Sequence, residues 1–124
     1  MPTNSKDHIF DEHLPLTPAL FHVLLALADG EKHGYAILKE VTQRTNGKVK
    51  LSAGTLYGII KRLDESGMIS EIAARPEIGM DDERRRYYRL TELGRQVAMA
   101  EASRLEEMVE MARAKRLVRK PRLA

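Results

Sequence analysis

The chain has 124 residues, a net charge of +3 and 43% hydrophobic residues, which suits one small globular domain with a modest core. Cysteine is absent, which excludes a disulfide framework and a cysteine nucleophile. No secretory leader pattern opens the sequence, and the longest strongly apolar run, residues 19–28, is too short to span a bilayer. We therefore expect a cytoplasmic protein that makes no membrane contact.

Charge is distributed unevenly along the chain. Counting Lys and Arg against Asp and Glu gives −3 for residues 1–32, +3 for 33–95, −3 for 96–112 and +6 for 113–124. A local excess of positive charge is typical of surfaces that bind nucleic acid. The middle of the chain and its C-terminal tail are therefore the segments to test for such a surface.

The N-terminal part predicts an arm followed by an unusually apolar helix. Residues 1–16 are mostly polar without a sustained period, which indicates an arm, and Thr17 before Pro18 is a helix-start signal. Residues 19–28 are then apolar on nearly every side, so this helix needs cover on more than one face. Because so short a chain has few elements to supply that cover, we expect a partner subunit to contact Leu20, Leu24 and Leu27.

The next two segments predict a pair of helices. Residues 33–46 carry an apolar stripe and end before Gly47, and residues 48–51 form an extended link. Ser52 is a good N-cap for the following helix, and Gly67 suits the left-handed residue that ends it. Its apolar stripe consists of Leu56, Ile59, Ile60 and Leu63. The opposite face is small, hydroxylated and basic, with Gly54, Tyr57, Gly58, Lys61 and Arg62.

A helix that enters the major groove of DNA needs this division. Small residues near its N-terminus let backbone amides approach phosphates, and cations follow along the same face. Any surface helix with solvated lysines would show a similar pattern when it is considered alone. The next segment therefore decides between the two interpretations.

Residues 68–75 and 84–90 predict two short strands joined by a polar loop, which is a β-hairpin of the kind called a wing. The returning strand carries Arg84, Arg85, Arg86 and Arg89. Such arginines neutralise phosphates or enter the minor groove, and the alternative is ion pairing with the loop carboxylates of residues 81–83. Tyr87 and Tyr88 point to opposite faces of the strand, so one of them should join the core.

The last predicted helix is capped by Thr91 and runs to about Val118. It is long for so small a domain, which favours contact with a second copy, although packing on its own domain would give the same apolar pattern. A basic tail follows over residues 119–124. The residues expected at the dimer interface of this helix are Ala98, Ala102, Leu105, Met108, Val109 and Ala112.

These elements predict a mainly α fold with a small β-hairpin wing, of class α+β. A winged helix-turn-helix domain is expected over residues 17–90 and a dimerisation helix over residues 91–118. The four histidines lack metal-ligand spacing with carboxylates, and no catalytic triad or glycine-rich phosphate loop is present, so we expect no metal, no cofactor and no enzymatic activity.

The chain resembles the PadR-like transcriptional regulators over about residues 16–116. The resemblance is carried by LTPALFHVLLALADGEKHGYAILKE, LSAGTLYGIIKRLDESGMI, RRRYYRLTELGR and the long closing helix. It implies a repressor that binds double-stranded DNA and forms a homodimer through the closing helix. Because a two-fold dimer presents two recognition helices, we expect the operator to be an inverted repeat. The resemblance also implies which residues contact that DNA: Tyr35, Ser52, Thr55, Tyr57, Lys61, Arg84, Arg85 and Arg86.

The short closing helix is similar to that of a PadR subgroup in which some members bind flat hydrophobic drugs at the dimer interface. Those members use large aromatic side chains for stacking, and this helix has none. Leu105, Met108 and Met111 either line an adaptable cavity for a small hydrophobic effector or form plain dimer core. A second alternative concerns function, because a winged helix also serves as a protein–protein interaction module that does not bind DNA.

Overall fold

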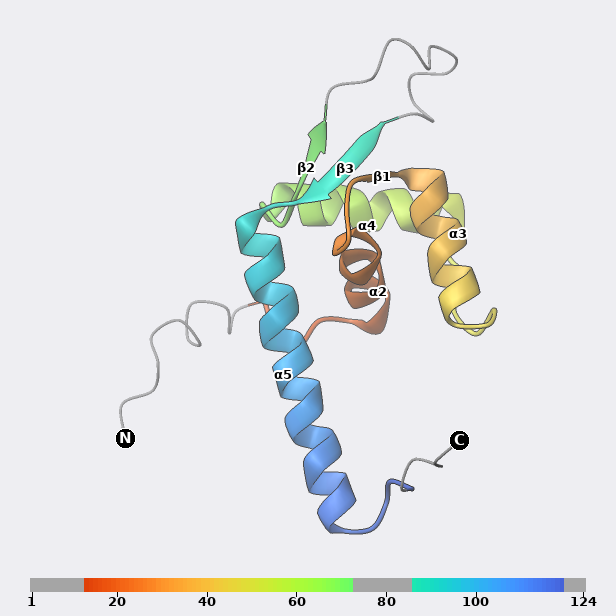
Figure 1. Ribbon diagram of the computed structural model, residues 1–124. Helices are drawn as coiled ribbons and strands as arrows, with labels where there is room; N and C mark the ends of the chain where they lie inside the picture. Colours follow the sequence, from red (N-terminus) through yellow and green to blue (C-terminus); the bar gives the residue numbers. More distant parts are fainter. Residues whose placement is uncertain (1–12, 73–85, 120–124) are drawn as a thin grey trace.

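The computed structural model describes residues 13–72 and 86–119 of the chain (Figure 1). These residues form four helices and a three-stranded antiparallel sheet, which confirms the predicted α+β winged-helix class. In chain order the elements are α2 (Pro18–Leu27), β1 (Lys32–His33), α3 (Gly34–Arg44), α4 (Ala53–Glu65), β2 (Ile69–Ile72), β3 (Tyr87–Leu90) and α5 (Glu92–Ala114).

Each described helix begins at a side chain that accepts a hydrogen bond from the first turn, where backbone N–H groups have no helical partner. The predicted caps Thr17, Ser52 and Thr91 are confirmed, with acceptor distances of 3.2, 3.1 and 3.0 Å. The cap of α3 was not predicted. There Nδ1 of His33 accepts the N–H of Ala36 at 3.2 Å.

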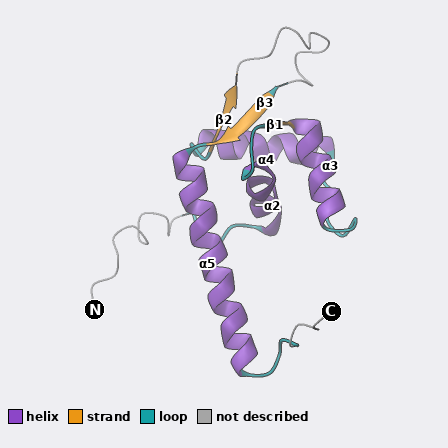
Figure 2. Cartoon of the chain, viewed as in Figure 1, coloured by secondary structure: helices purple, strands orange, loops and turns teal. Residues whose placement is uncertain are grey.

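The sheet contains one strand more than the hairpin predicted from the sequence. The strand order is β1–β3–β2, so the returning wing strand is central (Figure 2). β1 pairs with β3 through Lys32 opposite Tyr88 and His33 opposite Tyr87. β2 and β3 lie within the predicted strands, whereas residues 73–85, which include Arg84, Arg85 and the acidic loop, lie outside the described part of the chain.

The core is built around α2, which contacts α3, α4, α5 and β3. Leu24 and Leu27 are 0% and 1% exposed within a single chain. A residue without exposed surface has none to bury against a second copy, so the prediction that these two leucines lie at a dimer interface is wrong. The prediction underestimated how much of the surface of α2 is buried by α3, α4, α5 and β3 of the same chain.

The end of the predicted arm also belongs to the core. Leu16 is buried and Leu14 packs against the same cluster. The last apolar residues of the segment expected as an N-terminal arm, residues 1–16, therefore pack with the winged-helix domain. The structure describes nothing before residue 13.

Helix α5 starts inside the domain and then projects away from it (Figure 1). Its buried residues are Gly94, Val97 and Glu101, all in the first half. It ends at Ala114, four residues before the predicted end. Arg116 there adopts a left-handed conformation with φ 61°, and the N–H of Leu117 bonds to the carbonyl of Ala112 at 2.9 Å, which closes the helix.

Candidate nucleic-acid interface

Helix α4 presents a wholly exposed outer face. Its apolar stripe is buried as predicted, whereas Ser52, Thr55, Tyr57, Lys61 and Arg62 are exposed. A Cβ atom added to Gly54 or Gly58 would meet nothing within 4 Å, so the backbone is open to solvent at both positions. The Ser52 hydroxyl also lies 2.9 Å from that of Thr55, which holds two hydroxyls together at the helix start. This face combines cations, hydroxyls and accessible backbone.

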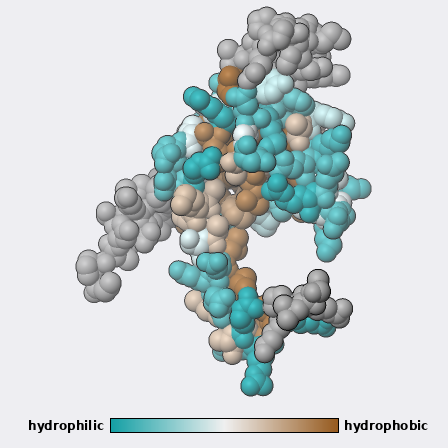
Figure 3. All heavy atoms as spheres, in the orientation of Figure 1, coloured by the Kyte–Doolittle hydropathy of each residue, from teal (hydrophilic) through white to brown (hydrophobic). Residues whose placement is uncertain are grey.

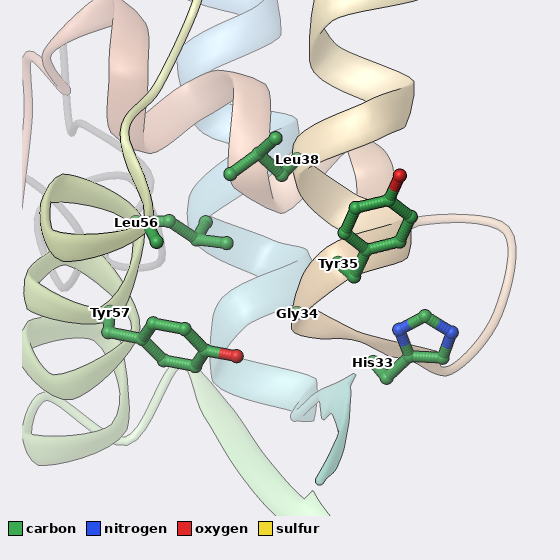
Figure 4. Close-up of a pocket in the computed structure, with 7 residues that line it drawn as sticks. His33, Gly34, Tyr35, Leu38, Leu56 and Tyr57 are labelled. Atoms are coloured by element: carbon green, nitrogen blue, oxygen red, sulfur yellow. The ribbon is translucent and has the colours of Figure 1, made fainter. Parts of the chain in front are cut away.

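Tyr57 lies across the gap between α4 and the start of α3. A Cβ atom added to Gly34 would lie 2.7 Å from the Tyr57 hydroxyl oxygen, so a larger residue there would displace the Tyr57 ring. Figure 4 shows the hydroxyl of Tyr57 directed toward Gly34. The ring keeps 39% of its surface exposed. The two helices of the helix-turn-helix are therefore held together by an aromatic side chain that is still accessible from solvent.

The start of α3 carries a small aromatic group. The rings of His33 and Tyr35 are stacked, with centroids 6.4 Å apart, and His33 meets Tyr87 of β3 edge-on at 5.4 Å. Tyr35 is 66% exposed. Since His33 also caps α3, it connects the helix start to the central wing strand. The exposed Tyr35 ring thus stacks on a histidine that Tyr87 of β3 contacts in turn.

A cavity of about 530 Å³ lies between the starts of α3 and α4 (Figure 4). Leu38 and Leu56 line it from the apolar side, and Tyr35 and Tyr57 flank it. Two of the residues expected at the DNA surface, Tyr35 and Tyr57, therefore line this cavity, whereas Ser52 and Thr55 do not. Lys61 lies one turn further along α4 from Tyr57.

The described part of the wing carries exposed arginines. Arg86 lies 3.7 Å from the carboxylate of Glu71 across the hairpin, and Nε of Arg89 donates to the Ser70 hydroxyl at 3.3 Å. Tyr88 is the core tyrosine of the pair, and burial raises the pKa of its phenol. The expected positions Arg84 and Arg85 lie outside the described residues.

The residues expected at a dimer interface fall into two groups. Leu20 and Ala98 are half-buried and pack against the core of their own chain, as Leu24 and Leu27 do more completely. Further along α5, Met108 is 52% and Val109 is 42% exposed, with Ala102 also exposed and Leu105 and Ala112 half-buried. Apolar atoms interrupt the hydrophilic surface along the projecting half of α5 (Figure 3).

Sequence reasoning missed one buried charge. Glu101 is 1% exposed, and its carboxylate contacts Arg104 and the backbone of Leu16. The hydrogen bond from Arg104 is the main cause that lowers the pKa of Glu101. A glutamate among helical alanines gives no sign of burial, because its partner lies 85 residues away along the chain.

Residues 23–100 match the model of the transcriptional regulator PadR-like family. A protein of Lysinibacillus sphaericus, itself uncharacterized, is 32% identical over 73 residues. That match covers 59% of this chain and 64% of the relative's length. Among the described residues, no helix has the length and apolar character needed to cross a membrane.

Solved structures share the fold at low sequence identity. A transcriptional regulator from Clostridium thermocellum has a TM-score of 0.64 at 20% identity, covering 92% of this chain and 97% of its own. A PadR family transcription regulator from Clostridium difficile has a TM-score of 0.63 at 21% identity, and the match covers 77% of this chain and 94% of the regulator. Bacillus subtilis PadR, in complex with operator DNA, has a TM-score of 0.57 at 18% identity, and the match covers 89% of this chain and 52% of that protein.

The family match covers more than half of the chain and includes α3, α4, the wing strands and the start of α5. The two structural matches show that these elements are also arranged in space as in the solved regulators. The chain therefore belongs to the PadR-like family of transcriptional regulators.

Proposed function

We propose that the protein is a sequence-specific DNA-binding repressor that acts as a homodimer in the cytoplasm on an inverted-repeat operator. The observation that carries the proposal is the outer face of α4, where Lys61 and Arg62 follow two hydroxyls and two open glycines. The complex of Bacillus subtilis PadR with operator DNA supports it, because that protein has the same fold.

The chemistry of this face suits a DNA backbone. The exposed N-terminal turn of α4 offers backbone N–H groups and the positive end of the helix dipole, both of which attract phosphate. Tyr35 and Tyr57 add hydroxyls from the two sides of the neighbouring cavity. Lys61 supplies a charge that contacts phosphate or a base edge in the major groove.

The dimer in this proposal forms through the projecting half of α5. Exposed methionines and Val109 on a helix that leaves its own domain are typical of a surface buried by association. A two-fold dimer would present two α4 helices to successive major-groove faces, about 34 Å apart, which requires an inverted-repeat operator.

The proposed signal is a small hydrophobic effector bound between the two α5 helices. Met108 and Met111 are exposed in one chain, and methionine side chains adapt to ligands of varied shape. Binding that changes the angle between the α5 helices would move the α4 helices off the operator spacing. Loss of operator binding upon addition of the effector is the measurement that supports this part of the proposal.

The test of DNA binding is a salt-dependent titration with DNA taken from the promoter of the protein's own gene. With roughly six to ten phosphate contacts, affinity should fall by about a thousandfold or more between about 50 and 200 mM salt. Lys61→Ala and Tyr57→Phe should weaken binding, by about 1 to 3 kcal/mol where Lys61 reads a base. Lys115→Ala, which removes one exposed charge beyond the far end of α5, is the matched control and should bind normally.

Unchanged affinity in both Lys61→Ala and Tyr57→Phe would exclude this face as the DNA surface. A protein that binds no duplex at low salt, yet is folded, would support the alternative of a winged-helix protein–protein interaction module. The two outcomes are distinct, because the first retains salt-dependent binding and the second lacks it.

A further inference from the structure

Glu101 is the only charged side chain in the buried core of residues 13–72 and 86–119. Its Oε1 accepts Nε of Arg104 at 2.6 Å, and its Oε2 accepts Nη2 of Arg104 at 3.0 Å and the N–H of Leu16 at 3.2 Å. Both carboxylate oxygens are therefore occupied. A buried charge is tolerated where it is paired and hydrogen-bonded in this way.

These contacts join two distant parts of the chain. Leu16 directly precedes Thr17, which caps α2, so the carboxylate of Glu101 fastens α5 to the start of the central helix. Arg104 also lies 3.1 Å from the sulfur of Met108 through Nη1. The buried contact thus continues onto the exposed surface of α5.

Glu101 is the last buried residue along α5. Gly94, Val97 and Glu101 are its buried residues, and the helix beyond them projects from the domain. The fully buried Gly94 and Val97 span only about 5 Å of the helix, with the half-buried Leu93 and Ala98 packed beside them, whereas Glu101 extends the buried stretch to about 10 Å. The remaining 13 residues reach about 20 Å further, so a tilt of about 10° moves the helix end by about one base-pair step.

We propose that Glu101 is a positioning residue, which fixes the angle between the projecting half of α5 and the winged-helix domain and thereby sets the spacing of the two α4 helices in the dimer. The second part rests on the proposed function, whereas the first concerns a single chain. Loss of the Arg104 pair should leave α5 helical but free to tilt about Val97.

The angle can be measured directly, because the chain has no cysteine of its own. Spin labels are attached at Glu65→Cys on α4 and Glu107→Cys on α5, both exposed, and the labelled chain is diluted into excess unlabelled chain. Pulsed paramagnetic resonance then reports the distance within one subunit. Glu101→Gln should broaden this distance distribution.

A matched control exists on the same helix. Glu110 pairs with Arg113 at the same three-residue spacing, at 3.2 Å, but its side chain is 63% exposed. Glu110→Gln should leave the distribution unchanged. If Glu101→Gln fails to fold by circular dichroism, Arg104→Gln takes its place and should also broaden it. A distribution that matches the parent in the folded variant overturns the proposal.

The operator provides the second measurement. Affinity is compared among DNA duplexes whose half-sites are moved one base pair closer or further apart. In Glu101→Gln the affinity ratio between the best spacing and its neighbours should fall to about one. A merely destabilised protein would instead lose affinity on all spacings and keep the ratio, which overturns the spacing role. Absence of DNA binding by the parent contradicts the proposed function and leaves the spin-label result standing.

Discussion

Gly94 lies where the start of α5 meets the turn before β2. A Cβ atom added there would lie 1.9 Å from the backbone carbonyl oxygen of Met68, and a backbone atom cannot move aside as a flexible side chain can. The same carbonyl accepts the N–H of Thr91 at 3.0 Å, which fixes it further. The residue identity at position 94 therefore controls how closely the wing and α5 approach.

We predict that Gly94→Ala lowers the free energy of unfolding by about 1 to 3 kcal/mol, because α5 must shift to relieve the overlap. Urea denaturation followed by circular dichroism measures the change. Gly58→Ala is the matched control, since a Cβ at that helical position meets nothing within 4 Å. That control should raise stability by about 0.5 to 1 kcal/mol. Equal effects of the two substitutions would contradict the role of Gly94.

The carboxylate of Glu101 predicts a dependence of stability on pH. Its pKa in the folded chain lies below the ordinary value of 4.5, chiefly because Arg104 donates to it. The unfolded chain therefore binds the proton more readily, and the stabilisation is complete above pH 4.5 and is lost as pH falls through the lowered pKa.

At neutral pH, the free energy of unfolding of Glu101→Gln should be about 1.5 to 3 kcal/mol lower than that of the parent. Urea titrations at descending pH should show this difference shrinking below pH 4.5. The pKa of Asp29 is also lowered, because Lys32 donates a hydrogen bond to it. Asp29 is present in both proteins, so its contribution to the pH dependence cancels in the comparison. A difference that stays constant down to low pH would show that the charge of Glu101 contributes nothing.

At the scale of elements, the helices could be predicted because their signals are local. A cap residue and an apolar stripe lie within a few positions of each other, and Thr17, Ser52 and Thr91 begin their helices as the sequence indicates. β1 could not be predicted, because two residues become a strand only through pairing with β3. The same limitation applies to Glu101, whose burial depends on a backbone amide from the other end of the domain.

The cap of α4 predicts a measurable stability effect. Ser52→Ala removes the acceptor for the Thr55 N–H and should lower the free energy of unfolding by about 1 kcal/mol. Thermal denaturation of the two proteins measures the change. Ser103→Ala, at an exposed position inside α5, is the comparison and should alter stability by less than about 0.5 kcal/mol. A similar loss in both variants would argue against a capping role.

At the scale of the whole molecule, the proposed dimer depends on the exposed apolar half of α5. Val109→Asp should place a charge in that interface, weaken association and reduce operator affinity together, because each half-site alone binds weakly. Light scattering should return twice the 14.1 kDa mass of one chain for the parent and a lower mass for the variant.

Ser103→Asp adds the same charge at another exposed position of the helix and should remain dimeric. A parent that scatters as a single chain at micromolar concentration would contradict the dimer.

The candidate site itself was predicted in part. Helix α4 and Tyr35 were named from the sequence, whereas the support of Tyr35 by His33 and Tyr87 depends on the central strand β3.

The order of the sheet also governs how the chain folds during its synthesis. Strand β1 leaves the ribosome long before its partner β3, and Leu16 leaves it 85 residues before Glu101. Until those partners emerge, the apolar surface of α2 lacks two of its covers, β3 and α5. The domain therefore closes late, and the nascent chain must remain soluble for most of its translation with its most hydrophobic helix incompletely covered.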